Sequence, residues 1–359
     1  MAIIKLIIAG ILALGQILSP VGAWLANSGE GAFFTDWSRE DEFTSEAYIE
    51  LEKEAGKDFV ILNLADVQLD DDELYEALGE ESMALVAKLI EDKEPDLITL
   101  SGDNAWGTMT YLKLIELVDS YGIPWAAVMG NHDGQGCMSE FWAAYHLAEA
   151  ENSLFQFGPD GMGYGNYVIN ITENGKIIHS VYMMDTHNNR EYNINGETVK
   201  GYDHLWDDQI DWYKWCVEGT NAIAGKTVES TVIMHIPVYE YFDAWYAVSS
   251  DVDDANGNLG TIDPAYADIA SGRRGEYGGH PPVSNGFFTL CKELGSTKNM
   301  VVGHDHVNSS SIVHEGIRLT YGLKLGEGCY FEEGMTGGTT LSIHSDGSAT
   351  TKHCYLELT

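Results

Sequence analysis

Basic residues are scarce in this sequence. Its 359 residues include 19 Lys and Arg against 56 Asp and Glu, which gives a formal net charge of −37. Proteins bind nucleic-acid backbones and anionic lipids mainly through clustered Lys and Arg. The composition therefore argues against a nucleic-acid partner. It is typical of an extracellular or salt-tolerant surface, and such a surface also attracts divalent cations.

Cysteine is also rare. The five cysteines are Cys137, Cys216, Cys291, Cys329 and Cys354, and no two of them form a CxxC pair. An odd number at scattered positions argues against a disulfide framework and against a thiolate metal site. We expect most of them to be small buried apolar residues, and the sequence leaves their disulfide state open.

No apolar run is long enough for a comfortable membrane span, which needs about 20 residues. The longest candidate, residues 6–18, follows Lys5 and precedes the small residues Val21-Gly-Ala23. A positive start, a short apolar run and small residues before a cut are typical of a secretory signal peptide. We therefore expect residues 1–23 to be a signal peptide cleaved after Ala23, and the mature chain to be secreted or extracytoplasmic without stable membrane association. An N-terminal core helix is the alternative.

The remaining chain begins as alternating strands and helices. Residues 24–56 are acidic and are expected to form a lead-in that packs against one domain at 57–359. Continuous apolar runs predict buried strands, and apolar residues at helical spacing predict helices between them. The strands are expected at 59–65, 96–101 and 124–129, and the helices at 73–92 and 108–121. Three such units in succession indicate an α/β domain that starts with a largely parallel sheet.

The second half is richer in strands. Helices are expected at 207–217 and 286–294, and 238–285 has the composition of a long loop. Strands are expected at 166–172, 177–184, 230–236, 299–303, 316–321, 339–344 and 351–358.

Polar residues that can bind metal follow five of the predicted strands. In chain order they are Asp66 and Gln68, Asp103, Asn131 with His132 and Asp133, His235, and His304 with His306. Ligands of open α/β sheets collect beyond the carboxyl ends of the strands. A single Asp or His after a strand is a weak signal, but the ordered set predicts one shared site.

These motifs resemble the calcineurin-like metallophosphoesterase superfamily. The order D-x-Q, GD, GNHD, H and GHDH is similar to the family pattern, over about residues 57–330. Tyr182-Met-Met-Asp185 and His235-Ile-Pro-Val-Tyr-Glu240 resemble its secreted and bacterial branch, which is related to purple acid phosphatases. The resemblance implies an α/β fold, a four-layer sandwich of two mixed β-sheets flanked by α-helices.

The resemblance also implies a dinuclear metal site. Asp103 would bridge two divalent ions, which its donors suggest are Mn, Zn or Fe. The expected ligands of the first metal are Asp66, Gln68 and His306, and those of the second are Asn131, His235 and His304. A hydroxide between the metals would attack phosphorus. His132, held by Asp133, would protonate the leaving group.

Two positions depart from the family pattern. Gln68 stands where the family often has His, and Trp106 stands where purple acid phosphatases have a Tyr ligand. An indole cannot coordinate through oxygen, so we expect no purple Fe³⁺–tyrosinate centre. Together the two departures leave open a site that works with one tightly bound and one loosely bound metal.

The expected function is hydrolysis of a small-molecule phosphate ester, with a phosphomonoester favoured. A phosphodiesterase or nucleotide hydrolase on the same site is the first alternative. A degenerate, non-catalytic module that binds metal or phosphate is the second, and an acidic extracellular Ca²⁺-dependent binding protein is the third. Substrate choice is expected to depend on residues 134–165 and 238–285. The sequence leaves the oligomeric state open.

Overall fold

The computed structural model describes residues 30–71, 76–135, 139–326 and 328–356. The signal peptide expected at 1–23 lies outside these ranges. Within them, no helix has the length and apolar character that a membrane span requires.

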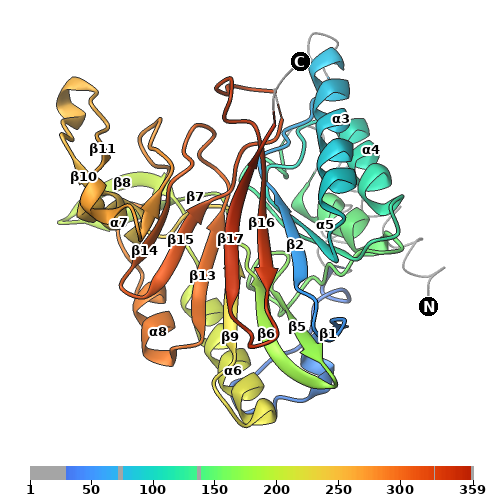
Figure 1. The fold of residues 1–359 in the computed structure, drawn as a ribbon. Helices are drawn as coiled ribbons and strands as arrows, with labels where there is room; N and C mark the ends of the chain where they lie inside the picture. The colour runs from blue at the N-terminus through green and yellow to red at the C-terminus, as the bar shows by residue number, and fades with distance from the viewer. Residues whose placement is uncertain (1–29, 72–75, 136–138, 327, 357–359) are drawn as a thin grey trace.

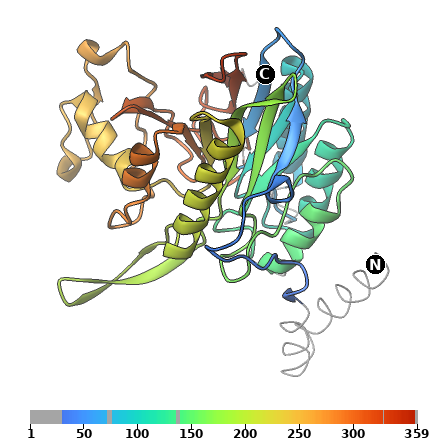
Figure 2. The ribbon, with the colours of Figure 1, turned by 90° about the horizontal axis from the view of Figure 1, so that it is seen from below.

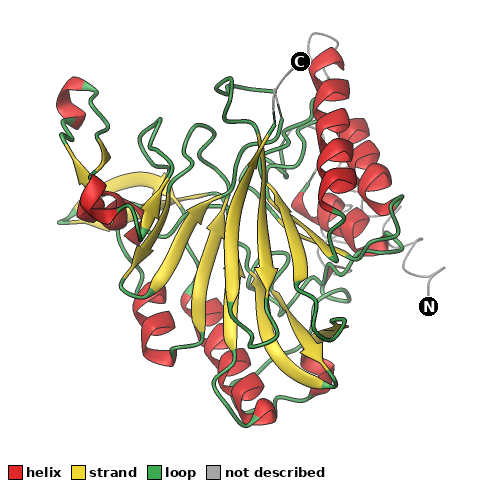
Figure 3. Ribbon diagram, viewed as in Figure 1, coloured by secondary structure: helices red, strands yellow, loops and turns green. Residues whose placement is uncertain are grey.

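Four layers make up the molecule, with two sheets packed face to face and helices on both outer sides (Figures 1 and 3). The first sheet has five strands. In spatial order they are β17 (Ala349–Tyr355), β16 (Gly337–Ile343), β2 (Phe59–Leu64), β3 (Leu97–Ser101) and β4 (Trp125–Val128). Strands β2, β3 and β4 are parallel, β16 is antiparallel to β2, and β17 is antiparallel to β16.

The second sheet has eight strands. In spatial order they are β1 (Ile49–Glu52), β5 (Tyr167–Glu173), β6 (Lys176–Met183), β9 (Glu229–Ile233), β13 (Thr297–Val302), β15 (Ile317–Tyr321), β14 (Ser311–His314) and β12 (Ala270–Ser271). The central strands β6, β9, β13 and β15 are parallel to one another, and antiparallel pairs flank them. Strand β1 comes from the expected lead-in and pairs in parallel with β5, so this segment forms one edge of the sheet.

Two groups of helices cover the outer faces. The helices on the five-stranded sheet are α3 (Glu76–Lys93), α4 (Thr108–Asp119) and α5 (Glu140–Glu149). Those on the eight-stranded sheet are α6 (Asp207–Ala224), α7 (Glu240–Val248) and α8 (Phe287–Leu294). A hairpin of β7 (Asn189–Ile194) and β8 (Glu197–Tyr202) projects from the body (Figure 2).

Side chains that alternate between the two faces of each strand contribute to two separate hydrophobic cores. In β6, Val181 and Met183 belong to the core shared by the two sheets, whereas Tyr182 packs toward α6 in the outer core. In β9, Ile233 faces the inner core and Val232 the outer one. Because successive strand residues point to opposite faces, a continuous apolar run is what a strand covered on both sides requires. The runs expected to be buried strands are therefore confirmed, and so is the four-layer fold.

The prediction of a long loop at 238–285 is wrong. This stretch contains α7, and its buried residues Tyr241, Ala244, Trp245 and Val248 follow helical spacing. It also contains β12 and the short paired strands β10 (Ser249–Ser250) and β11 (Thr261–Ile262). The many Tyr, Asp and Gly residues concealed the helical period. Helix α5, strand β14 and the β7–β8 hairpin were also missing from the expected elements.

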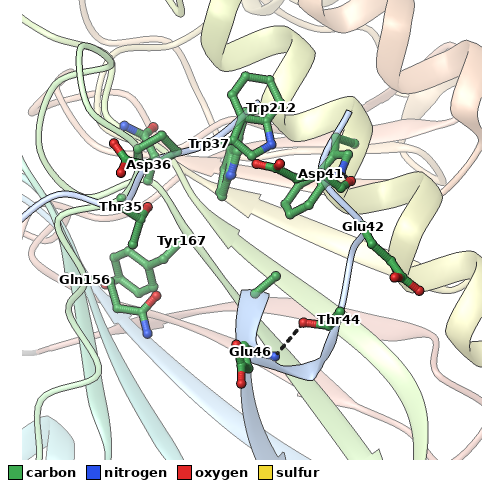
Figure 4. A pocket seen from close by; sticks show the side chains of 15 residues that line it. Thr35, Asp36, Trp37, Asp41, Glu42, Thr44, Glu46, Gln156, Tyr167 and Trp212 are labelled. Carbon is green, nitrogen blue, oxygen red and sulfur yellow. Dashed lines mark hydrogen bonds between the residues drawn. The ribbon is translucent and has the colours of Figure 1, made fainter. Parts of the chain in front are cut away.

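The segment before β1 packs along α6. Phe43 packs edge-on against Trp215 of α6, with ring centroids 4.9 Å apart. A cavity of about 250 Å³ lies between this segment and the domain, and Trp37 and Trp212 line it (Figure 4). A Cβ added at Gly219 of α6 would lie 2.2 Å from the Phe43 ring, so the helix accepts Phe43 only because residue 219 is glycine.

Gly219→Ala tests this packing. Alanine is favoured over glycine inside a helix by about 1 kcal/mol, yet we expect the variant to melt below the wild type because Phe43 must leave α6. Gly79→Ala in α3 is the matched control, because its Cβ would meet only Leu69, at 3.9 Å. The control should melt at or above the wild type in a thermal-unfolding experiment. Equal stabilisation by both substitutions would contradict this packing.

Candidate metal centre

The predicted site residues meet where the two sheets end. Asp66 and Asp103 follow β2 and β3, Asn131 lies beyond β4, and His235 and His304 follow β9 and β13. These strands run in one direction within each sheet, so their carboxyl ends form a common edge (Figure 1). This is where ligand-binding residues of open α/β sheets are expected.

Four site residues at this edge have left-handed backbone. The φ angles are 51° at Asp66, 49° at Gln68, 51° at Asp103 and 75° at His304. Non-glycine residues in this conformation carry strain of about 1–3 kcal/mol each, which persists only where the surroundings impose it. Strain of this kind is typical of functional sites.

Glycine at position 130 allows the strand ends to approach one another. A Cβ added there would lie 2.1 Å from the Asp103 backbone nitrogen and 2.2 Å from Asp103 Oδ1. Any larger residue would therefore displace the carboxylate on which both halves of the site depend.

One half of the site contains Asp103, His235 and His304, all buried, with one donor atom from each within 4.8 Å of the others. His235 Nδ1 lies 2.9 Å from the Ser101 carbonyl oxygen. A carbonyl can only accept, so Nδ1 carries the hydrogen and Nε2 faces the site. There, Nε2 lies 3.3 Å from Asp103 Oδ1, 3.0 Å from Asn131 Oδ1 and 3.2 Å from His304 Nδ1.

The other half contains Asp66, Asp103 and His306, again with donor atoms within 4.8 Å of one another. His306 Nδ1 lies 3.0 Å from the Tyr330 carbonyl oxygen, which leaves Nε2 directed at Asp66 Oδ1 at 3.7 Å. The backbone N–H of His304 donates to Asp66 Oδ2 at 2.9 Å. Asp103 belongs to both halves and is therefore placed to bridge them.

Asp103 and His235 shift one another's pKa in the direction that favours a positive charge beside the carboxylate. Burial lowers the pKa of His235, but Asp103 outweighs that effect and brings it to about 10. Burial raises the pKa of Asp103, but His235, His132 and His304 together hold it well below its usual range. A cation among these donors is therefore stabilised by the carboxylate between them.

The donor set fits two divalent cations. Carboxylate oxygens, an amide oxygen and imidazole nitrogens lie in two clusters that share Asp103. The rings of His235 and His306 are each oriented by a hydrogen bond from the opposite ring nitrogen to a backbone carbonyl. Such donors suit Mn²⁺, Zn²⁺ and Fe²⁺ better than Ca²⁺, which prefers oxygen ligands only. The arrangement is that of a dinuclear divalent metal site.

Comparison with known families agrees with this geometry. The sequence profile described as calcineurin-like phosphoesterase matches residues 59–308. The chain belongs to this family.

Curated relatives of this calcineurin-like phosphoesterase include plant and yeast proteins. The probable inactive purple acid phosphatase 14 of Arabidopsis thaliana is 28% identical over 264 residues, which cover 66% of this chain and 60% of the relative. The phosphatase DCR2 of Saccharomyces cerevisiae is 28% identical over 218 residues, which cover 54% of this chain and 36% of the relative. The chain therefore spans about 60% of the plant relative's length.

Among solved structures, a dimetal phosphatase from Danio rerio matches with a TM-score of 0.49 and 11% sequence identity. The alignment covers 83% of this chain and 96% of that chain.

His132 lies at the solvent-exposed side of the site. Its side chain is 32% exposed, and Nε2 lies 3.9 Å from Asp103 Oδ2. Its backbone N–H donates to Asp103 Oδ1 at 2.8 Å, and its ring packs edge-on against Trp106 at 5.1 Å between centroids. The ring is therefore next to the metal cluster while remaining accessible to a substrate.

The expectation that Asp133 holds His132 is wrong. Asp133 is fully buried, and its carboxylate accepts hydrogen bonds from the backbone N–H groups of Asn104 and Gly130, each at 2.8 Å. It also accepts from the Asn104 amide at 3.0 Å. His132 Nδ1 is enclosed and has no protein partner in the described structure. Adjacent side chains in a turn point in different directions, and Asp133 joins the two turns that carry Asp103 and Asn131.

Gln68 is oriented by a lysine that the sequence motifs did not indicate. Lys324 is buried, and its Nζ donates to the Asp66 carbonyl at 2.8 Å and to Gln68 Oε1 at 2.7 Å. An ammonium can only donate, so it fixes the amide oxygen of Gln68 on its own side. The Gln68 NH₂ group then donates to Asp103 Oδ2 at 3.2 Å. In this arrangement the oxygen of Gln68 faces Lys324 instead of the expected first metal position.

Gly130→Ala tests how the turns position the bridging carboxylate. We expect a folded protein that retains at least tenfold less Mn²⁺ after dialysis, because the new Cβ displaces Asp103. Overpacking of this kind lowers the free energy of unfolding by about 1–3 kcal/mol, which thermal unfolding can measure. Gly31→Ala, where nothing lies within 4 Å of the added Cβ, should change neither quantity. Wild-type metal content in Gly130→Ala would contradict the close approach.

Proposed function

We propose that this chain hydrolyses phosphate esters and prefers phosphomonoesters of small molecules. The observation that carries the proposal is the pair of donor clusters that share Asp103 next to the accessible ring of His132. Membership of the calcineurin-like phosphoesterase family supports the same reaction class.

Six residues would hold two divalent cations, which we propose are Mn, Zn or Fe. They are Asp66, Asp103, Asn131, His235, His304 and His306. When bound, such a pair polarises the phosphoryl oxygens and lowers the pKa of a water molecule near phosphorus. The protein contributes the rigid spacing of the donors: Asp103 lies on strained backbone, and both His235 and His306 are oriented by backbone carbonyls.

His132 would protonate the leaving oxygen. General acid catalysis requires a proton donor within hydrogen-bond reach of the departing atom and open to the substrate. The partly exposed imidazole lies beside Asp103, and Trp106 packs edge-on against its ring. Asp133 acts as a positioning residue through the turns of Asn104 and Gly130.

Charge and the N-terminal sequence support a small extracytoplasmic substrate. The net charge of −37 repels polyanions such as nucleic acids more strongly than a small phosphate ester, which carries few charges. The positive start, apolar run and small residues of 1–23 favour export. The yeast relative is described as a phosphatase, which favours a monoester over a diester.

Two substitutions test the reaction. After reconstitution with Mn²⁺ or Zn²⁺, wild-type protein should hydrolyse p-nitrophenyl phosphate faster than bis-p-nitrophenyl phosphate. Asp103→Ala should abolish turnover because both donor clusters lose their shared ligand. His132→Ala should lower kcat by about 10²–10⁴ while metal content stays at the wild-type level. Undiminished hydrolysis by Asp103→Ala would refute the assignment.

A module that binds metal without hydrolysis is the second candidate, and the Lys324–Gln68 contact favours it. The buried ammonium of Lys324 donates to the Asp66 carbonyl and to Gln68. It therefore places positive charge beside the donor cluster that contains Asp66, and this charge opposes binding of a cation there. The plant relative is also described as a probable inactive phosphatase. Metal stoichiometry measured in parallel with turnover separates the two candidates.

Lys324→Met tests this effect of charge on metal binding. We expect wild-type protein to bind one Mn²⁺ tightly and a second at least tenfold more weakly in calorimetric titrations. Lys324→Met removes the repulsion, and in a partly buried setting unit charges about 4 Å apart interact by about 4 kcal/mol. The variant should therefore bind the second ion at least tenfold more tightly. The exposed control Lys226→Met should bind as the wild type does, and unchanged weak binding in Lys324→Met would contradict the role given to Lys324.

A further inference from the structure

A second cavity lies at the edge where the two sheets adjoin, with no residue in common with the metal centre. It has a volume of about 540 Å³ and lies between β17 of one sheet and β12, β14 and β15 of the other. His353 of β17 joins the two sides, because its Nε2 donates to the Ser309 carbonyl at 3.0 Å. A cavity of this size matches the usual range for a small-molecule ligand.

The lining of this cavity differs in charge from the rest of the protein. The chain has 56 acidic residues and 19 basic ones, yet the lining contains Arg318 and Lys352 and no Asp or Glu. Three residues with hydroxyl groups, Ser271, Ser311 and Thr351, also line it. Cationic groups beside hydroxyl donors, without a carboxylate, are the chemistry that recognises an oxyanion.

Arg318 is the residue that points to a ligand. Its guanidinium is half-buried, and burial lowers its pKa. Within the described residues, no carboxylate lies at ion-pair distance from it, and its hydrogen bond is from Nη1 to Ser311 Oγ at 3.2 Å. A guanidinium has five N–H donors, and a partly buried charge is costly without a counter-ion. In a chain with so many carboxylates, an arginine that lacks one has donors left for a bound anion.

The surrounding groups favour an anion over a cation. Ser311 Oγ also lies 2.8 Å from Thr320 Oγ1, which fixes the serine beside the guanidinium. Lys352 is exposed at the rim and, in the described part of the chain, forms no ion pair. His353 donates from Nε2 to the Ser309 carbonyl, and its Nδ1 lies 3.0 Å from Thr339 Oγ1. Burial lowers the pKa of His353, so this side of the cavity carries no negative charge.

We propose that this cavity binds the phosphate group of a small anion, either free phosphate or a phosphorylated metabolite. Arg318 holds the oxyanion through the N–H groups at the edge of its planar guanidinium, as arginine does with phosphate. Lys352 and the hydroxyl groups of Ser271 and Thr351 complete the set of donors. The site is separate from the metal centre, so its occupation does not require hydrolysis.

The test is calorimetric titration of the metal-loaded full chain with inorganic phosphate and with glucose 6-phosphate, with glucose as the control that lacks a phosphate. Asp103→Ala removes the shared ligand of the metal centre, so the binding that remains in it reports the second cavity. We expect this binding to fall at least tenfold when Arg318→Gln is added and to fall less with Arg318→Lys. Equal affinity for both phosphate compounds identifies a site for the phosphate group alone, whereas tighter binding of glucose 6-phosphate identifies a metabolite site.

A second pair of variants controls for misfolding. Lys352→Gln at the exposed rim should weaken binding two- to fivefold, and Lys226→Gln, an exposed lysine elsewhere, should leave it unchanged. Hydrolysis of p-nitrophenyl phosphate should be the same in Arg318→Gln as in the wild type, which shows that the variant is folded. Phosphate binding in Asp103→Ala that is absent, or that is equal with and without Arg318→Gln, would overturn the proposal without bearing on the proposed hydrolysis.

Discussion

A single buried carboxylate connects the parts of this site. Asp103 lies on left-handed backbone after β3 and faces His235, the backbone N–H of His132 and the amide of Gln68. Both donor clusters include it. A carboxylate fully removed from water is stable only with several donors or cations around it. The turns after the other strands therefore supply hydrogen bonds or imidazoles to this one group.

The fold explains why those turns meet. Parallel strands in each sheet end at one edge, and the two sheets pack face to face over an inner core that runs beneath the site. Glycine at 130 lets the turn after β4 approach Asp103 at a distance that a Cβ would forbid. The strain at Asp66, Gln68, Asp103 and His304 is thus imposed by a rigid scaffold, which keeps the donors at fixed spacing.

The meeting of the strand ends and their polar residues could be predicted because the sequence signals for them are local. An apolar run followed at once by Asp, Asn or His indicates both the strand and the edge to which its ligand belongs. Contacts between distant segments left no such signal: Lys324 orients Gln68 from 256 positions away. The expected Asp133–His132 contact was wrong because adjacency along a turn does not set side-chain direction. Helix α7 was missed because aromatic and acidic residues concealed its period, and the signal peptide expected at 1–23 stays a prediction.

We propose that Asp103 bridges two divalent cations. Anomalous diffraction from crystals of the Mn²⁺-loaded protein tests it most directly. We expect one strong peak among Asp103, Asn131, His235 and His304, and a second, weaker peak among Asp66, Asp103 and His306. Peaks that both lie away from Asp103, or a single peak that Asp103 does not contact, would contradict it.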